Sequence, residues 1–142
     1  MTMLWKTTRY QVDLSQPQVM GIVNVTPDSF SDGGQHADTA SALRHAEQLL
    51  KDGAHILDIG GESTRPGADD VSIDEELRRV IPVIEALAKR VPIPISIDTS
   101  KPEVMRAAVE AGAGMVNDVY ALRREGALDA AAELGVPVVL MH

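Results

Sequence analysis

The stretch that decides the fold is ISIDTSKPEVMRAAVEAGAGMVNDV, residues 95–119. It opens with a short apolar run that ends at Asp98, and a segment of helical period follows in which Met105 and Ala108 share one face. A second apolar run begins shortly after Gly112, a residue typical of helix ends. A strand, a helix and a strand in this order form a parallel unit with a right-handed crossover. The centre of the chain is therefore predicted to be α/β.

The same alternation extends in both directions from this stretch. Helix, glycine, short spacer and apolar strand recur as DGAHILDIG, AGAGMVNDV and ELGVPVVLMH. The predicted strands are residues 19–25, 56–60, 95–98, 115–118 and 138–141, and the predicted helices are residues 38–52, 73–90, 101–111 and 124–134. The 142 residues are expected to form a single domain, with residues 1–17 as an N-terminal hairpin.

Local signals mark two helix starts and one interruption. Ser72 with Glu75, and Ser100 with Glu103, have the spacing of a capping box, so each serine is predicted to cap a helix. Pro82 lies inside the second helical segment and predicts a kink or a break there.

Composition excludes several classes of function. The net charge of −8 and the isoelectric point near 4.8 argue against a nucleic-acid-binding surface, which needs a basic patch. Without cysteine the chain has neither disulfides nor thiolate metal sites. No apolar run approaches the length of a membrane span, and no apolar stretch follows Lys6 and Arg9 as in a signal peptide. A soluble cytoplasmic protein is expected.

Two architectures fit five strands and four helices: an open doubly wound sheet and part of a (β/α)₈ barrel. Polar residues at the strand ends favour the barrel, although any one of them could simply begin a turn. They are Asn24, Asp58, Asp98, the pair Asn117 and Asp118, and His142. Together on one rim of a parallel sheet they predict a ligand mouth, whereas a doubly wound sheet would gather its ligand groups at one switch point.

The types of group suggest the ligand. A carboxylate accepts two parallel N–H bonds, and an amide offers both a donor and an acceptor. Asp98 and Asn117 could therefore bind the edge of a cyclic 2-amino-4-oxo-pyrimidine at the base of an apolar pocket. Such groups are costly to bury without a partner, which favours a polar planar occupant.

Three long strings of sequence resemble one family. MGIVNVTPDSFSDGG (residues 20–34), LDIGGESTRPGA (57–68) and the 95–119 stretch are similar to successive motifs of dihydropteroate synthases. The resemblance runs without a gap from about residue 18 to residue 142. It implies a TIM barrel that condenses 6-hydroxymethyl-7,8-dihydropterin pyrophosphate with p-aminobenzoate, releasing pyrophosphate and 7,8-dihydropteroate. Sulfonamides as inhibitors and a homodimer are implied as well.

The resemblance also assigns roles by position. Asn24 would help bind Mg²⁺ and the pyrophosphate, and Asp32 would face the cation left when pyrophosphate departs. Arg65 would tie the second loop into the assembled site. The expected pterin-binding residues are Asp58, Asp98, Asn117, Val119 and Met141, and those expected to shape the p-aminobenzoate site are Phe30, Ser63, Thr64 and Pro66.

The chain ends at the fifth predicted strand, where the family's barrel would continue for three more. We expect an incomplete barrel that is not a competent synthase alone, because the family's further pterin-binding and pyrophosphate-binding residues lie in the other half. Two alternatives are a pterin-binding methyltetrahydrofolate methyltransferase-type domain and a non-catalytic truncated fragment. The first-loop string NVTPDSFSDGG argues against the methyltransferase.

Overall fold

Five parallel strands and four helices make up the main body of the computed structural model, which describes residues 4–7, 10–25, 35–62 and 71–140. The main sheet contains β3 (Met20–Asn24), β4 (Ile56–Gly60), β5 (Ile95–Asp98), β6 (Met115–Asp118) and β7 (Val138–Leu140), paired in chain order. The helices are α1 (Gln35–Lys51), α2 (Ile73–Arg90), α3 (Pro102–Ala111) and α4 (Ala127–Leu134). A separate hairpin pairs β1 (Leu4–Lys6) with β2 (Gln11–Asp13) in antiparallel fashion.

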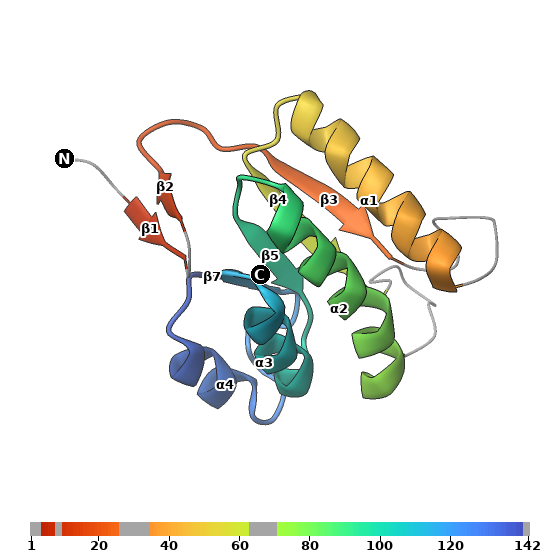
Figure 1. Cartoon of the computed structure of the whole chain (residues 1–142). Helices are drawn as coiled ribbons and strands as arrows, with labels where there is room; N and C mark the ends of the chain where they lie inside the picture. The colour runs from red at the N-terminus through yellow and green to blue at the C-terminus, as the bar shows by residue number, and fades with distance from the viewer. Residues whose placement is uncertain (1–3, 8–9, 26–34, 63–70, 141–142) are drawn as a thin grey trace.

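The arrangement of the layers decides between the two predicted architectures. Strand order follows chain order without a switch point, and the helices pack in a row on one face of the sheet (Figure 1). A doubly wound fold would place helices on both faces and reverse the strand order. The sheet is therefore a run of barrel-type βα units, and the barrel is not closed within the described residues.

The core lies between the sheet and the helices. Apolar side chains alternate along each strand, so that residues such as Leu57, Ile59 and Ile97 point toward the helices and are fully buried. They meet the apolar faces of the helices, including Leu87 of α2 and Met105 of α3, both also fully buried. This one-sided core leaves the opposite face of the sheet, the concave interior of a barrel, available for other groups.

The observed helices confirm the four predicted ones, with corrections to the first residues of α1 and α4. α1 begins at Gln35, before the predicted residue 38, and α4 begins at Ala127 rather than at residue 124. The late start of α4 has a local cause, since Gly126 precedes it in a left-handed conformation (φ 82°). None of the helices in the described ranges is long and apolar enough to cross a membrane.

Only one of the two predicted capping boxes forms a cap. Ser72 Oγ accepts a hydrogen bond of 3.1 Å from the Glu75 backbone N–H and caps α2 as predicted. The prediction for Ser100 is wrong: Lys101 is the N-cap of α3 and its side chain makes no capping bond. Pro102 takes the first helical position, where its missing N–H costs nothing, and this fixes the helix start one residue later than the serine pattern implies.

Pro82 does not break α2. The helix runs from Ile73 to Arg90 through this proline, so the predicted break is wrong. Val80, Val83 and Ile84 around it are fully buried against the sheet. Because tertiary packing supplies most helical stability in proteins, burial on both sides of Pro82 can offset one lost backbone bond.

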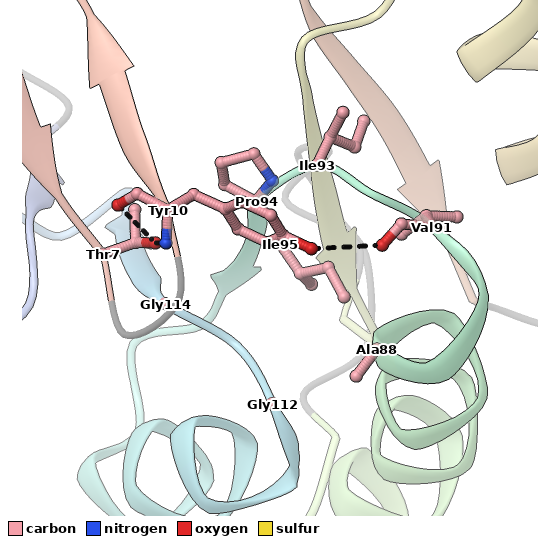
Figure 2. Close-up of a pocket in the computed structure, with 9 residues that line it drawn as sticks. All are labelled: Thr7, Tyr10, Ala88, Val91, Ile93, Pro94, Ile95, Gly112 and Gly114. Carbon is pink, nitrogen blue, oxygen red and sulfur yellow. Dashed lines mark hydrogen bonds between the residues drawn. The ribbon is translucent and has the colours of Figure 1, made fainter.

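The N-terminal hairpin covers the amino end of the sheet. Val12 of β2 is buried against Ile56 and Met115, which begin β4 and β6 on the face away from the helices. Figure 2 shows Tyr10 lying across the turn that precedes β5, with its hydroxyl donating a 3.4 Å bond to the Val91 carbonyl. The hairpin therefore packs on the amino end of this face, opposite the carboxyl ends of the strands.

Candidate functional site

Strand pairing places the predicted site residues in two adjacent rows on the concave face. The upper row, at the carboxyl edge, runs through Asn24, Gly60, Asp98, Asn117 and Val139, each paired with the next across neighbouring strands.

The row below it runs through Ile22, Asp58, Ser96 and Met115. Register alone therefore gathers five polar side chains from four strands onto one surface: Asn24, Asp58, Ser96, Asp98 and Asn117.

Asp58 and Asn117 form the buried floor of this surface. Asn117 Nδ2 donates a 3.1 Å hydrogen bond to Asp58 Oδ2, and both residues are buried, with Asp58 only 1% exposed. The remaining oxygen of each side chain, Oδ1, has no hydrogen-bond partner within the described part of the chain. Buried polar atoms without partners are rare in native proteins, so these two oxygens indicate a place where a ligand or water donates hydrogen bonds.

Ser96 adds a hydroxyl to the same floor. It is fully buried beside Asp58 in the strand register, and its Oγ is also without a hydrogen-bond partner among the described residues. Burial raises the pKa of Asp58, an effect that exceeds the opposing hydrogen bond from the Asn117 amide. Ser96 was not among the predicted site residues, although its place two residues before Asp98 on the same strand face was a usable signal.

Asp98 is the most strongly perturbed carboxyl group in the described ranges. Burial, followed by the negative charges of Asp58, Glu76, Asp118 and Glu62 in that order, raises its pKa from 3.8 to about 7. A carboxyl group poised near neutrality in a cleft is typical of functional sites. It can accept hydrogen bonds when ionised or donate one when protonated.

Gly60 keeps the surface open between Asp98 and Asn24. A Cβ at Gly60 would lie 3.4 Å from Asp98 Oδ2 and 3.7 Å from Asn24 Oδ1. A side chain here would therefore stand between the two polar groups, whereas glycine lets a ligand reach both. Asn24 itself is exposed at the end of β3.

The other predicted residues divide into two sets. Val119 directly follows β6 and is half-buried beside the upper row. The remaining predicted residues lie outside the described ranges: Phe30, Asp32, Ser63, Thr64, Arg65, Pro66 and Met141. His142 is outside them as well.

Asp118 is not part of the ligand surface. Its carboxylate accepts bonds of 2.8 Å and 2.9 Å from the backbone N–H groups of Tyr120 and Leu122. These bonds stabilise a turn in which Ala121 and Leu122 have positive φ angles of 54° and 63°. The residue thus organises the connection after β6 and acts on the site only through its charge.

The described residues contain no group of three or more metal-ligating side chains. A metal site built from protein side chains alone is therefore not indicated among the described residues. An exposed amide oxygen such as that of Asn24 would instead suit a cation that keeps several waters and shares phosphate oxygens with a ligand.

Residues 20–142 match the family model described as pterin binding enzyme. The chain belongs to the pterin-binding enzyme family. The buried carboxylate and amide floor lies within the matched range, at the end where this family's barrel fold opens to ligands.

Individual members of the pterin-binding enzyme family are similar over almost the whole chain. The dihydropteroate synthase of Escherichia coli K12 is 60% identical over 131 residues, which are 92% of this chain and 46% of that protein. A structure of Xanthomonas albilineans dihydropteroate synthase with 4-aminobenzoic acid has 61% identity and a TM-score of 0.96, covering 100% of this chain and 52% of that one.

A second Xanthomonas albilineans structure, in complex with 7,8-dihydropteroate, has 58% identity and a TM-score of 0.88 over 98% of this chain and 50% of that one. The chain thus spans about half the length of the relatives it matches.

Proposed function

We propose that this chain supplies the pterin-binding half of a dihydropteroate synthase. The reaction joins 6-hydroxymethyl-7,8-dihydropterin pyrophosphate to p-aminobenzoate, giving 7,8-dihydropteroate and pyrophosphate. The observation that carries the proposal is the buried pair of Asp58 and Asn117 beside Asp98, which offers acceptors and a donor on one surface. The similarity to synthases at about 60% identity supports the same assignment.

The floor fits the polar edge of a pterin. The free Oδ1 atoms of Asp58 and Asn117 accept N–H bonds, and Asp98, which pairs with Asn117 in the upper row, accepts two more when ionised. The Oδ1 atoms of Asp58 and Asn117 are buried without a hydrogen-bond partner, which costs free energy. A pterin that donates hydrogen bonds to them removes this cost, so its binding is favoured. Val119, half-buried beside the row, is proposed to pack on the ring.

In the proposed reaction the bond between the pterin methylene carbon and the pyrophosphate oxygen breaks, and pyrophosphate takes the electron pair. The electron-rich pterin stabilises the resulting methylene cation, and the negative side chains around Asp98 favour positive charge at this rim. The amine nitrogen of p-aminobenzoate then forms the new bond and loses a proton. A pKa near 7 suits Asp98 to orienting the pterin through this change of charge.

Mg²⁺ is proposed as the cofactor, with Asn24 Oδ1 as its protein ligand beside the opening that Gly60 leaves. When bound, it would neutralise charge on the departing pyrophosphate. Asn24 holds its amide at the exposed end of β3, within reach of a group bound over Asp98.

The remaining assignments rest on the family resemblance. Asp32 facing the cation, Arg65 in the second loop, and Met141 against the ring are part of the proposal. Residues Phe30, Ser63, Thr64 and Pro66 are proposed to form the p-aminobenzoate site, where sulfonamides would compete. A homodimer and a cytoplasmic location stay predictions.

A synthase assay on the complete polypeptide that contains residues 1–142 tests this proposal. Formation of 7,8-dihydropteroate should require both substrates and Mg²⁺, and Asp98→Ala should lower kcat/KM by about 100-fold or more, because the pterin loses a half-buried acceptor. Arg106→Met, which removes an exposed ion pair with Glu133 on the outer helices, should leave activity unchanged. Absence of product, or an Asp98→Ala variant as active as the parent, would contradict the proposal.

A further inference from the structure

A cluster of three charged side chains lies behind the ligand surface, on the helix side of the sheet. Lys101 Nζ binds Glu62 Oε2 at 2.8 Å and Glu76 Oε1 at 2.7 Å. The side chain of Glu76 is 1% exposed, and those of Lys101 and Glu62 are 14% and 17% exposed. Because two carboxylates share one ammonium group, the three side chains together carry one net negative charge. At this depth the charge is much less screened by solvent than a surface charge is.

Three contacts hold Glu76 against the end of β5. Its Oε2 atom accepts a hydrogen bond from the Thr99 hydroxyl, and Thr99 directly follows Asp98. Its Oε1 atom binds Lys101, whose backbone N–H donates a 3.2 Å bond to the same Thr99 hydroxyl. A Cβ at Gly61 would lie 3.4 Å from Glu76 Cγ, so the backbone after β4 packs on the stem of this glutamate. The Glu76 carboxylate therefore has a fixed position, bonded to the residue that follows Asp98.

Asp98 is surrounded by negative charge from the elements that border it. Among the described residues, the charges that raise its pKa together with burial are, strongest first, those of Asp58 on β4, Glu76 on α2, Asp118 on β6 and Glu62 after β4. Lys101, before α3, divides its positive charge between two carboxylates. On β3, Asn24 is neutral, and Gly60 separates it from Asp98 in the register.

The two arginines near the cluster have other partners. Arg79 binds Glu75 Oε1 at 3.1 Å and donates a 2.8 Å bond to the Gly61 carbonyl. Arg124 lies over the Tyr120 ring, 4.7 Å from its centre, and acts on Glu62 only through its charge. Within the described ranges, no ion pair joins either arginine to Glu76. Lys101 is therefore the cation that pairs with Glu76.

The ion pairs of the cluster persist at neutral pH. Burial works against the charged form of Glu62, yet its bonds to Lys101 and to the Val71 N–H outweigh burial and lower its pKa. Burial also disfavours the Lys101 cation, but its bonds to the two carboxylates outweigh burial and raise its pKa. One net negative charge therefore remains behind β5 under the conditions in which an enzyme works.

Glu76 acts on Asp98 without being part of the ligand surface. It lies on α2, which packs on the face of the sheet opposite to Asp98, and its charge acts on Asp98 second only to that of Asp58. Asp58 belongs to the ligand surface itself, through its bond with Asn117. A change of charge at Glu76 therefore alters Asp98 while the groups that contact a ligand stay the same.

We infer that Glu76 is a positioning residue which, held by Lys101 and Thr99 behind the end of β5, controls through its buried charge the protonation of Asp98 and with it the binding of the pterin. The inference rests on the proposed function, in which ionised Asp98 accepts hydrogen bonds from the pterin. Glu76 touches neither substrate in this account and acts through Asp98.

Titration of the Asp98 carboxyl carbon by NMR tests the inference without any substrate. The signal is followed in the complete polypeptide and is identified by its absence from Asp98→Asn. Its midpoint should lie about 0.5 to 1 pH unit lower in Glu76→Gln than in the parent, because one buried negative charge is removed. Asp74→Asn is the matched control, since it removes an exposed charge from the same first turn of α2, and it should leave the midpoint unchanged.

The pH dependence of kcat/KM for the pterin pyrophosphate gives a second readout, which a purely structural role of Glu76 would not move. This ratio reports the ionisation of groups in the free enzyme. Its fall between pH 8 and pH 6 should be about threefold smaller in Glu76→Gln than in the parent, because more of Asp98 stays ionised at pH 6. Asp74→Asn should follow the parent, and comparison at the same two pH values cancels the titration of the substrate.

A second variant covers the case in which Glu76→Gln does not fold. Glu62→Gln also takes the cluster from one net negative charge to none, and it keeps an acceptor for the Val71 N–H. The midpoint of Asp98 should move to lower pH in this variant as well. An unchanged midpoint there would contradict the inference as directly as one in Glu76→Gln.

The outcomes separate the inference from the function on which it rests. An inactive parent protein would overturn the proposed function and, with it, the link to the pterin. An active parent whose Asp98 midpoint and pH profile are the same in Glu76→Gln would overturn the inference alone. An equal shift in Asp74→Asn would overturn it too, because the effect would then belong to the total charge of the protein.

Discussion

Asp98 lies where a charged carboxylate is costly to keep. It is half-buried on the concave face, next in the register to Asn117 and close to the charge of Asp58. Its pKa of about 7 means that the folded chain binds this proton more tightly than the unfolded chain, whose aspartates titrate near 3.8. The free energy of unfolding should therefore fall as pH rises from about 4 to about 7 because of this group.

Asp98→Asn should remove that pH dependence. The variant is expected to be more stable than the parent chain by about 2 to 4 kcal/mol at pH 8, with the gain vanishing near pH 4, where Asp98 is protonated and resembles asparagine. Urea unfolding at both pH values measures the difference. Glu110→Gln, on the exposed side of α3, is the control and should show no comparable gain. Equal stability of Asp98→Asn and the parent at pH 8 would show that Asp98 is ionised at little cost.

Site residues whose position follows from strand register could be predicted from the sequence. Asn24, Asp58, Asp98 and Asn117 each end or nearly end an apolar run, and parallel pairing then places them together. Their hydrogen bonds could not be predicted in the same way. The Asn117 to Asp58 bond is diagonal between rows and crosses β5, and strand ends alone do not reveal it.

The ion pairs that Lys101 forms with Glu62 and Glu76 were not predicted, for a physical reason. Lys101 is 39 residues from Glu62 and 25 residues from Glu76 along the chain. Ion pairs between separate elements have no periodic signature, and most charged residues lie on solvated surfaces. Only the packing of α2 against the turn after β5 brings the three groups together.

At the scale of single elements, the two capping-box patterns give a direct comparison. Ser72→Ala should destabilise the protein by about 1 kcal/mol, because the Glu75 N–H loses its acceptor at the start of α2. Ser100→Ala should change stability by less than about 0.5 kcal/mol, since Ser100 Oγ has no hydrogen-bond partner within the described residues. Thermal unfolding of the two variants checks this. A larger loss for Ser100→Ala than for Ser72→Ala would contradict the assignment of the caps.

The capping-box pattern could not distinguish the start of α2 from the start of α3, because it records only the spacing of two residues. At α3, Pro102 fixes the first helical residue, and Thr99 Oγ1 accepts the Lys101 N–H at 3.2 Å. At α2 no proline competes, and the serine acts as predicted. Inside α2 a proline had less effect than predicted. No break forms at Pro82, because burial of its neighbours outweighs the effect of the proline on the helix.

For the whole molecule, the order of helices and strands was predictable, and the contacts that cover the amino end of the sheet were not. Each βα unit has a local signature, so the parallel sheet and its one-sided helices follow from chain order and crossover handedness. The packing of β2 across the amino end depends on Val12 meeting Ile56 and Met115, which no local pattern encodes. Ile22 and Leu140, on the two outer strands β3 and β7, are 48% and 53% exposed, as expected for a barrel that is not closed.

The central claim is that the carboxyl edge of this sheet binds the pterin. Calorimetric titration of the complete polypeptide with pterin pyrophosphate and Mg²⁺ tests it most directly, with Asn117→Leu as the site variant and Ser72→Ala, which changes only the cap of α2, as the control. The account predicts saturable binding that Asn117→Leu weakens by about 100-fold, because Asp58 loses its partner and the pterin loses the amide. Equal binding by Asn117→Leu and Ser72→Ala would contradict it.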